Sequence, residues 1–420
     1  GTASTSSPPS YSAEKIAGND DLLNEILLRL PIKSLMKFKS VSKHWLSLIS
    51  NPDFSRHRSP FPTSASGLFF AKHSRSRRAR LEFDFIDLNH NSNPAHPPFR
   101  SLAVTDNRPG IKILQSCNGL LLCCTSQAFR PTTNYYVYNP TTKHYTVLPP
   151  LVFPRCTFRA IYGVTLAFDP SKSPHYKVIC IRNSDVADGQ FQIEIYSSET
   201  GPWRISSLGS FAADFTTQFD DGVFWNGAVH WFCPSGTSLY FKIDEERLCE
   251  MPMLPVPDDS ETYNRMLGYF GESRDHMHFV DHIHENGEIR VNVYEMERDY
   301  SMVSTAFPEV IPSSLIQRLA SQEHLFSILC VVRGELDEDS CLVFGVPGKV
   351  LRYNFESKTL YNLCDIEPAG TEENFEIMSL KDRGFIGVGV VARDRNGSVL
   401  AGSSVQITGS LTVHVAECLG

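Results

Sequence analysis

Short apolar segments separated by turn residues fill most of this 420-residue chain from about residue 67 onward. They come in pairs, and the second member of each later pair has one form: an apolar strand ending in an aromatic residue, a polar turn and another apolar strand. The aligned aromatic residues are Tyr138, Tyr196, Phe241, Tyr294 and Tyr353. Their separations are 58, 45, 53 and 59 residues, about 54 on average. A degenerate period of this size is typical of repeat architectures.

The repeat favours a β-propeller. One small sheet cannot bury both of its faces, so repeated sheets stack side by side around an axis, and four-stranded blades repeat at roughly 40 to 50 residues. Together with the first strand pair, GLFFAK and LEFDFIDL, the pattern predicts a mainly β chain with a propeller of about six blades over residues 67–365. A β-sandwich or a pair of barrels is the alternative.

Residues 21–49 are the only stretch with clear helical spacing. Asn19, Asp20 and Asp21 supply an N-cap and negative charge at the start of a first helix, which Pro31 ends. A second apolar pattern predicts two short helices with a break near residues 40–42. This head has about 35 residues, fewer than the roughly 40 that an unaided core usually needs. We expect either the β body or a partner to cover its apolar surface.

Composition limits the partners and the compartment. The net charge is −8, from 39 Lys and Arg against 47 Asp and Glu, so nucleic acid is not the expected partner. The eleven cysteines are odd in number and include no C-x-x-C pair, which indicates reduced thiols in the cytoplasm or nucleus. No apolar run approaches the roughly 20 residues that span a bilayer. Residues 1–17, rich in Ser, Thr and Pro, are expected to be a disordered tail.

The helical head resembles the F-box. The matching positions are Asp20-Asp21, Glu25-Ile26-Leu27, Arg29-Leu30-Pro31, Leu35, Phe38, Val41-Ser42-Lys43, Trp45, Leu48-Ile49 and Asp53-Phe54. The resemblance assigns residues 18–56 to an F-box and implies docking onto the Skp1 adaptor of a cullin-type ubiquitin ligase. The contact residues it implies are Leu22, Leu23, Ile26, Leu27, Leu30, Pro31, Ile32, Leu35, Val41 and Trp45. The family usually has Leu-Pro where this chain has Gly18-Asn19, which implies weaker docking.

Motifs of the β body resemble the F-box-associated interaction domain that follows plant F-boxes. They are SCNGLLLC at 116–123, YNPTTK at 138–143, LAFDP with YKV within 166–178, and WNGAVHW at 225–231. The resemblance implies a divergent kelch-like propeller. Each motif also has a structural interpretation, because Asn118-Gly119, Asn139-Pro140 and Asn226-Gly227 are turn formers and the flanking aromatic residues suit a blade core.

The sequence HMHFVDHIH at 276–284 is the sharpest candidate for metal chemistry. On a strand, His276 and His278 share one face, and imidazoles two residues apart can chelate a transition metal. Neither a thiolate nor a helical H-x-x-x-H accompanies them. A solvated hairpin is therefore the favoured interpretation, and neither a metal nor a cofactor is predicted. The basic run KHSRSRRAR at 72–80 is similarly interpreted as a solvated loop.

The C-terminal residues 385–417 resemble the opening hairpin of plant RNase H-like domains, with Glu417 at one carboxylate position. Catalysis in that family needs several carboxylates that hold two metal ions. The resemblance therefore implies a truncated, inactive fragment over 385–420. The alternative is that these residues supply closing strands for the propeller. Asn396-Gly397-Ser398 is interpreted as a hairpin turn rather than a glycosylation site.

No catalytic sequence motif appears, so no catalytic residue is predicted. The leading hypothesis is a non-catalytic adaptor: the head docks on Skp1, and through it on cullin, while the propeller binds an unknown protein substrate. One alternative is a propeller interaction module that acts outside a ligase. A metal-dependent nuclease or a propeller oxidase is the enzymatic alternative.

Overall fold

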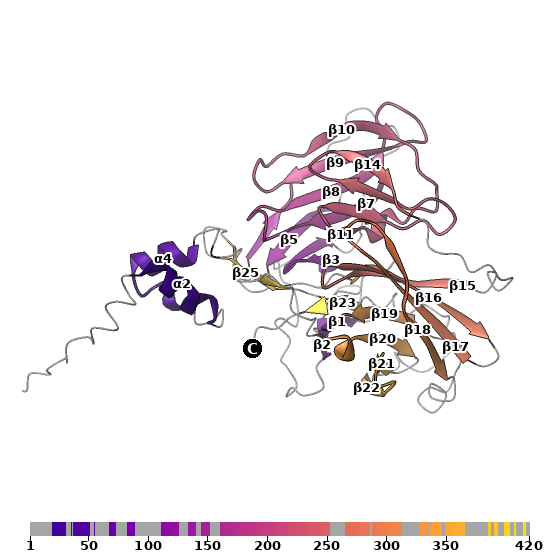
Figure 1. Cartoon of the computed structure of the whole chain (residues 1–420). Coiled ribbons are helices and arrows are strands. Elements are labelled where there is room, and N and C mark those ends of the chain that lie inside the picture. Colours follow the sequence, from indigo (N-terminus) through magenta and orange to yellow (C-terminus); the bar gives the residue numbers. More distant parts are fainter. Residues whose placement is uncertain are drawn as a thin grey trace, which may run out of the picture.

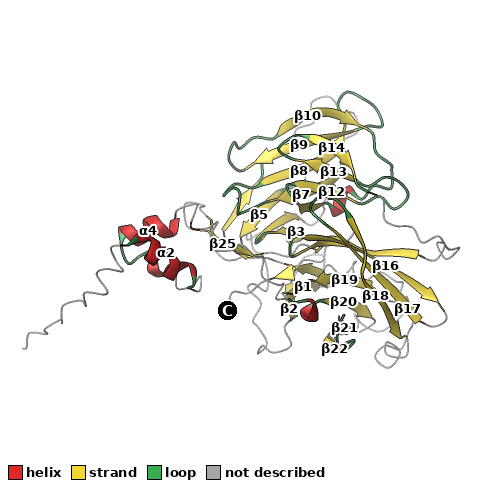
Figure 2. Cartoon of the chain, in the orientation of Figure 1, coloured by secondary structure: helices red, strands yellow, loops and turns green. Residues whose placement is uncertain are grey.

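The structure is a computed structural model of the whole chain (Figure 1). It describes residues 19–30, 35, 37–50, 54, 67–72, 82–88, 111–125, 133–139, 144–151, 160–252, 265–285, 288–312, 327–334, 336–346 and 349–365, together with 385–387, 390–393, 399–403, 407–408 and 415–416. Among the described residues, the helices α2 (Asp20–Leu28) and α4 (Lys43–Ser50) precede the strands (Figure 2).

Five antiparallel sheets, here called blades 1 to 5, each contain four consecutive strands. Blade 1 holds β3 (Ile111–Cys117), β4 (Leu120–Thr125), β5 (Tyr135–Asn139) and β6 (His144–Val147), and blade 2 holds β7 (Ile161–Ala167), β8 (Lys177–Asn183), β9 (Phe191–Ser197) and β10 (Arg204–Phe211). The short η1 (Phe219–Asp221) leads into blade 3, with β11 (Val223–Trp225), β12 (Ala228–Trp231), β13 (Leu239–Lys242) and β14 (Arg247–Glu250). Blade 4 holds β15 (Arg265–Ser273), β16 (His276–Glu285), β17 (Glu288–Met296) and β18 (Met302–Pro312), and blade 5 holds β19 (Ser327–Val332), β20 (Cys341–Val346), β21 (Lys349–Asn354) and β22 (Leu360–Asp365), with η3 (Asp337–Asp339) between β19 and β20.

The first strands of successive blades contact one another, from β3 through β7, β11 and β15 to β19, so they form the inner strands of a propeller. Each repeated aromatic residue lies on the third strand of its blade: Tyr138 on β5, Tyr196 on β9, Phe241 on β13, Tyr294 on β17 and Tyr353 on β21. The last four are buried and Tyr138 is half-buried. The predicted propeller is confirmed, and the sandwich and double-barrel alternatives are wrong.

The expected count of about six blades is not matched, because five blades are built from consecutive strands. The first predicted pair does form β1 (Gly67–Lys72) and β2 (Glu82–Asp87), which lie antiparallel. The other partners of β1 are two C-terminal strands, β23 (Phe385–Gly387) and β27 (Val415–Ala416). This sheet packs beside blade 5, since Leu68, Ile86 and Leu88 belong to the same hydrophobic core as the strands of that blade.

The remaining C-terminal strands also pair within the body. β24 (Val390–Arg393) and β25 (Val399–Ser403) form an antiparallel hairpin, as predicted, although its turn at 394–398 lies outside the described residues. β26 (Ile407–Thr408) adds to the inner edge of blade 4 next to β15. The RNase H-like and kelch-like interpretations stay predictions.

One buried side chain, that of Gln115, links the inner strands of blades 1 and 2 to the segment that enters blade 3. The Gln115 amide nitrogen, on β3, donates to the Gly222 carbonyl at 2.9 Å, and its amide oxygen accepts from the Leu166 backbone N–H at 2.5 Å. Gln115 is 4% exposed, so both halves of its amide need partners. The contacts link blade 1 to blade 2 and to the segment that enters blade 3.

Two Asn-Gly turns connect neighbouring blades. Asn118 and Gly119 have φ of 44° and 84°, and Asn226 and Gly227 have φ of 50° and 76°, which is the conformation of a type I′ hairpin turn. The Asn118 amide donates to the Phe168 carbonyl of blade 2 at 2.7 Å. The Asn226 amide donates to the Arg298 carbonyl of blade 4 at 2.8 Å. The predicted turn formers at these two sites are confirmed, and their side chains also hold the next blade.

Replacing Asn226 should separate these two roles. Asn226→Ala loses the hydrogen bond and puts at φ 50° a residue that tolerates the left-handed region less well than asparagine, so the free energy of unfolding should fall by about 2 kcal/mol. Asn226→Gly loses only the hydrogen bond and should cost about 1 kcal/mol or less. Urea denaturation of the full chain measures both. Equal costs for the two variants would show that the backbone conformation is not the reason for asparagine.

Candidate functional site

The helical head has a small core of its own. Its buried members are Leu23 and Leu27 from α2, Leu35, Ile49 from α4, and Phe54, each 0–4% exposed. Leu30, Phe38 and Trp45 pack around them, with the Phe38 and Trp45 rings edge to face at 5.2 Å. The head is therefore more self-contained than its length suggests. Figure 1 shows it lying to one side of the strands.

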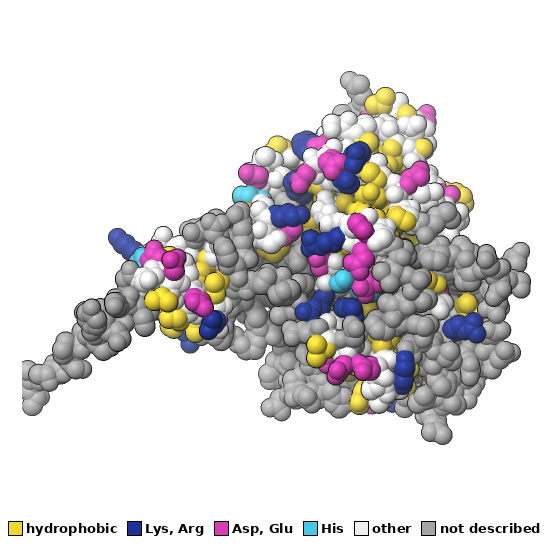
Figure 3. Space-filling view, in the orientation of Figure 1, with side chains coloured by type: hydrophobic (Ala, Val, Ile, Leu, Met, Phe, Trp, Pro, Cys, Tyr) yellow, Lys and Arg dark blue, Asp and Glu magenta, His cyan; other side chains and the backbone are white. Residues whose placement is uncertain are grey.

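Four large apolar side chains remain on the surface of the head. Leu22 and Ile26 on α2 are each 45% exposed, Val41 in the turn before α4 is 60% exposed, and Leu46 on α4 is 44% exposed. Leu22 and Ile26 are four residues apart and share one helix face. Hydrophobic side chains gather on the head in Figure 3, next to acidic and basic ones. These four side chains are here called the head surface. Their exposure fits the expectation that the β body or a partner covers apolar side chains of the head.

Short polar contacts fix the geometry of the head. The Asn19 carboxamide oxygen accepts from the backbone N–H groups of Asp21 and Leu22 at 3.1 and 3.2 Å, so the predicted N-cap is confirmed. The break before α4 is also confirmed, because residues 39–41 form a turn and the Ser42 hydroxyl accepts from the Trp45 N–H at 3.1 Å. Asp20 Oδ1 lies 3.0 Å from His44 Nε2 of α4. The residue that stands where the family has Leu-Pro thus serves as a helix cap.

The structure divides the ten predicted contact residues into three groups. Leu22, Ile26 and Val41 are exposed, Leu23, Leu27 and Leu35 are buried within the head, and Leu30 and Trp45 are half-buried. Pro31 and Ile32 lie outside the described residues. Sequence reasoning missed Leu46, which lies off the apolar stripe of its helix. An apolar residue on an otherwise polar helix face is the signal that marks it.

Leu27 and Leu22 form a matched pair for testing this division. Leu27→Ala leaves a cavity in the core of the head and should cost about 2–4 kcal/mol, whereas Leu22→Ala removes a half-exposed side chain and should cost less than about 1 kcal/mol. Hydrogen exchange of the α2 amides in the full chain measures this local stability. Protection should fall at least tenfold for Leu27→Ala only. Similar losses in both variants would contradict the assigned burial.

Strand connectivity assigns the propeller loops to two faces. Turns between the first and second and between the third and fourth strands lie at one end of each blade, here called the Asn-Gly face after 118–119 and 226–227. Loops between the second and third strands, and those that join successive blades, lie at the other end. That end is called the phenylalanine face, after Phe215, and it includes 184–190, 212–222 and 232–238.

Two ion pairs on the described part of the Asn-Gly face join blade 2 to blade 3. Lys177 of blade 2 lies 2.7 Å from Asp244 of blade 3, and Arg204 pairs with Glu246. The hydrogen bond from Arg204 is the main reason that the pKa of Glu246 falls to about 2. These pairs are structural, since each joins neighbouring blades.

The phenylalanine face carries the two most exposed large apolar side chains in the described chain. Phe215 is 92% exposed and Val186 is 83% exposed. The loops 184–190, 212–222 and 232–238 contain five aspartates and neither Lys nor Arg. Beside Phe215, the Asp214 carboxylate accepts from the Thr216 hydroxyl and backbone N–H at 2.6 and 2.8 Å, and these bonds lower its pKa. The combination suits a partner that offers apolar and basic groups.

The histidine-rich segment is one continuous strand, β16, at the middle of blade 4. The predicted solvated hairpin is therefore wrong, because β15 and β17 cover both edges of the strand. His278, Asp281 and His282 are at most 5% exposed, and Asp281 accepts a hydrogen bond from the Asn292 amide at 2.7 Å. The side chain of His284 lies outside the described part of the strand.

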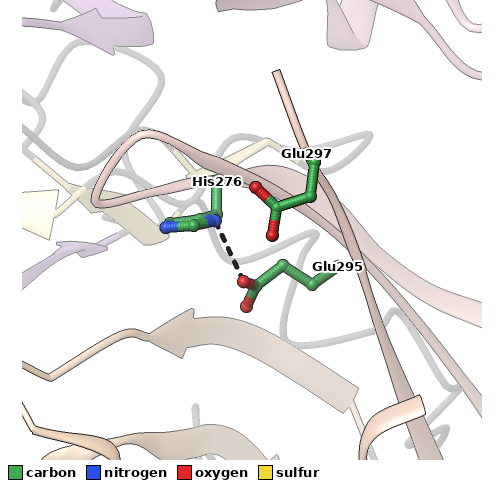
Figure 4. Close-up of side chains that lie close together, drawn as sticks. All are labelled: His276, Glu295 and Glu297. Carbon is green, nitrogen blue, oxygen red and sulfur yellow. Dashed lines mark ion pairs between the residues drawn. The ribbon is translucent and has the colours of Figure 1, made fainter. Parts of the chain in front are cut away.

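A polar cluster lies on one face of β16 and β17. His276 Nδ1 is 2.9 Å from Glu295 Oε1, and Glu297 lies beside them (Figure 4). His278 Nε2 is 3.1 Å from Glu295 Oε2. Burial alone would raise the pKa of Glu295, but the imidazoles of His276 and His278 beside its carboxylate hold it well below its ordinary value. The same contact raises the pKa of His276, whereas burial lowers the pKa of His278.

The nine cysteines within the described residues are all free thiols, and seven are buried. Burial raises the pKa of Cys124 to about 12, which keeps this thiol protonated and unreactive. This agrees with the interpretation of the cysteines as reduced. Among the described helices, none combines the length and the apolar character needed to cross a membrane. The basic run is described only at Lys72, so its predicted role is not tested.

Comparison with known protein families finds a match for the helical head and another for the propeller. The F-box domain family matches residues 19–57, and the F-box associated beta propeller domain family matches residues 71–324. The chain belongs to the F-box proteins with an F-box-associated propeller. It is 36% identical over 387 residues to the F-box protein At5g07610 of Arabidopsis thaliana, covering 85% of this chain and 88% of that protein.

More distant F-box proteins of the same plant share part of the chain. The F-box/kelch-repeat protein At3g17530 is 27% identical, over 60% of this chain and 65% of that protein. The F-box protein At5g03970 is 26% identical, over 63% of this chain and 62% of that protein. These matches extend the likeness beyond the F-box into the propeller.

Proposed function

We propose that this F-box protein is a non-catalytic substrate-recognition adaptor of an SCF-type ubiquitin ligase. The head binds a Skp1-like adaptor, and through it cullin, while the propeller binds a target protein. An F-box joined to an F-box-associated propeller implies a substrate-recognition role in such ligases. An adaptor acts by bringing two proteins together and needs no catalytic acid, base or nucleophile of its own. Recruitment raises the effective concentration of target lysines near the ubiquitin-carrying enzyme. The free, buried thiols support a cytoplasmic or nuclear location.

The head surface is the observation that carries the proposal. The head folds around its own core, yet Leu22, Ile26, Val41 and Leu46 remain exposed. A small helical unit gains from covering such a surface with a partner helix. Leu23, Leu27 and Leu35 then act as positioning residues, which hold the exposed ones in place from within. Asn19 supports the same arrangement by capping α2.

The head surface gives a sharp test of adaptor binding. Leu22→Asp with Ile26→Asp puts two charges on exposed positions and should reduce recovery of a Skp1-like protein at least tenfold in a pull-down with the full chain. The helical content should not change, because both positions are exposed. The ion-paired surface residue Arg29, replaced by Ala, is the control and should be recovered with Skp1 like the wild type.

The alternative is a propeller that acts outside a ligase. Equal recovery of Skp1 by wild type and by the Leu22→Asp, Ile26→Asp variant would favour it and would overturn the adaptor proposal. Leu22 and Ile26 test adaptor binding better than Leu30 and Trp45, which are also predicted contact residues. Leu30 and Trp45 are half-buried in the head, so replacing them would also weaken its fold.

For the target, we propose the phenylalanine face, and a segment that presents apolar side chains among basic ones. Val186 lies in a loop of blade 2 and Phe215 in the loop that leads into blade 3, and Asp185 and Asp214 are their sequence neighbours. On the Asn-Gly face, Lys177 pairs with Asp244 and Arg204 pairs with Glu246 across blades 2 and 3. The high exposure of Phe215 and Val186 is what favours the phenylalanine face, where Asp185 also pairs with the buried Arg182.

A double variant separates target binding from adaptor binding. Phe215→Ser with Val186→Ser should keep Skp1 recovery and lose specific proteins from proximity labelling in proteasome-blocked plant cells. The Leu22→Asp, Ile26→Asp variant should show the reverse pattern. Tyr361→Ser, at an exposed aromatic residue on blade 5, is the matched control. A labelling pattern unchanged by the Phe215 and Val186 substitutions would place the target elsewhere.

The domain boundaries belong to the same proposal: a tail at 1–17, an F-box at 18–56, a propeller at 67–365 and closing strands within 385–420. The pairing of β1 with β23 and β27 supports closing strands rather than a separate RNase H-like fragment. We also propose that the sheet of β2, β1 and β23 closes the ring as a sixth unit. Its core is shared with blade 5, and β23 contacts β3 of blade 1.

A further inference from the structure

We propose that His276, Glu295 and Glu297 bind one zinc ion at the end of blade 4. The three side chains offer an imidazole nitrogen and two carboxylates, and their ligand atoms lie within 4.8 Å of one another (Figure 4). Imidazole and carboxylate are both zinc ligands, and three protein ligands with one water complete a tetrahedral site.

Strand register places these ligands together. β16 and β17 pair antiparallel, with His278 opposite Glu295 and Met277 opposite Met296. Side chains two residues apart on a strand share a face. His276 and His278 therefore lie on the same face as Glu295 and Glu297. Glu297 begins the turn after β17, where its N–H donates to the Ser301 carbonyl at 3.0 Å and its carbonyl accepts from the Tyr300 N–H at 2.8 Å. Two neighbouring strand ends thus present the ligands on a rigid support.

The closest two ligand atoms lie slightly nearer to each other than two ligands of one zinc ion do. His276 Nδ1 and Glu295 Oε1 are 2.9 Å apart, but they are not aligned as a hydrogen bond. Two ligands of a tetrahedral zinc ion, each about 2.0–2.1 Å from the metal, lie roughly 3.3 Å apart. A movement of a few tenths of an ångström would therefore let a cation sit between these atoms.

The second oxygen of Glu295 is held by other groups. His278 Nε2 lies 3.1 Å from Glu295 Oε2, and Arg333 Nε, from the segment after β19 in blade 5, lies 3.5 Å from it. These contacts orient the carboxylate and leave Oε1 directed at His276, as outer-shell partners do for metal ligands. Arg333 balances one of the two carboxylate charges, so a cation near Oε1 would balance the other.

Partial exposure gives the ion an entry path. The His276 side chain is 34% exposed and Glu297 is half-buried, while Glu295 is 7% exposed. Because a bound ion would join β16 to the turn after β17, zinc should stabilise the folded chain by mass action. The site lies on a different part of the chain from the head surface, so it is independent of adaptor binding.

The experiment is a titration of the metal-free full chain with zinc alone, followed by calorimetry and thermal unfolding. One ion should bind per chain, and the midpoint of unfolding should rise with zinc concentration. Glu297→Gln keeps the shape of a partly exposed side chain and should weaken zinc binding at least tenfold. His276→Gln should do the same, whereas the exposed His175→Gln should bind like the wild type.

Cobalt distinguishes this site from the thiols. Substituted for zinc, it should give a spectrum without sulfur-to-metal charge transfer, because the three ligands are nitrogen and oxygen donors. Absence of stoichiometric binding would overturn the proposal, and so would a thiolate spectrum or zinc binding unchanged in both Glu297→Gln and His276→Gln. In those cases the cluster is an ion pair of His276 with Glu295. Circular dichroism of each variant checks that a lost signal does not come from unfolding.

Discussion

The propeller depends on one constraint: a four-stranded sheet has two apolar faces, and each face must be buried against a neighbouring blade. The clusters of buried side chains accordingly extend between neighbouring blades rather than lying within one, as the core shared by blades 4 and 5 and the sheet of β1 and β2 shows. Apolar burial is non-directional, so by itself it does not fix how one blade is oriented against the next. The Gln115 amide and the Asn-Gly turns fix the orientation of neighbouring blades, since each forms hydrogen bonds with specific backbone atoms of another blade.

The head solves a different problem at a smaller scale. Its α2 helix presents Leu23 and Leu27 inward and Leu22 and Ile26 outward, so residues adjacent in sequence have opposite roles. Such a unit can hold its own shape and still benefit from a partner. Combined with a propeller that exposes Phe215 on one face, the arrangement suits a protein that brings two others together.

Much of this architecture was predictable because it follows from local periodicity. The aromatic residues from Tyr138 to Tyr353 mark the third strand of each blade, and Asn19 and Ser42 mark helix starts. The prediction for the histidine segment is wrong, since a strand with many polar residues is expected to be exposed to solvent when the strands beside it, here β15 and β17, are not known. His278 is polar but buried because Glu295, 17 residues further along the chain, faces it from the neighbouring strand.

The sequence by itself determined the two classes of structure, helical head and repeated β blades, and the family to which they belong, because these depend on spacing within short segments. Only the tertiary structure decided how the chain ends pair, which loops share a face and which apolar residues stay exposed. β1 pairs with β23 and β27, more than 300 residues away, and no local pattern contains that contact. Exposure likewise depends on what covers a side chain, and for Phe215 and Leu22 nothing in the neighbouring sequence specifies it.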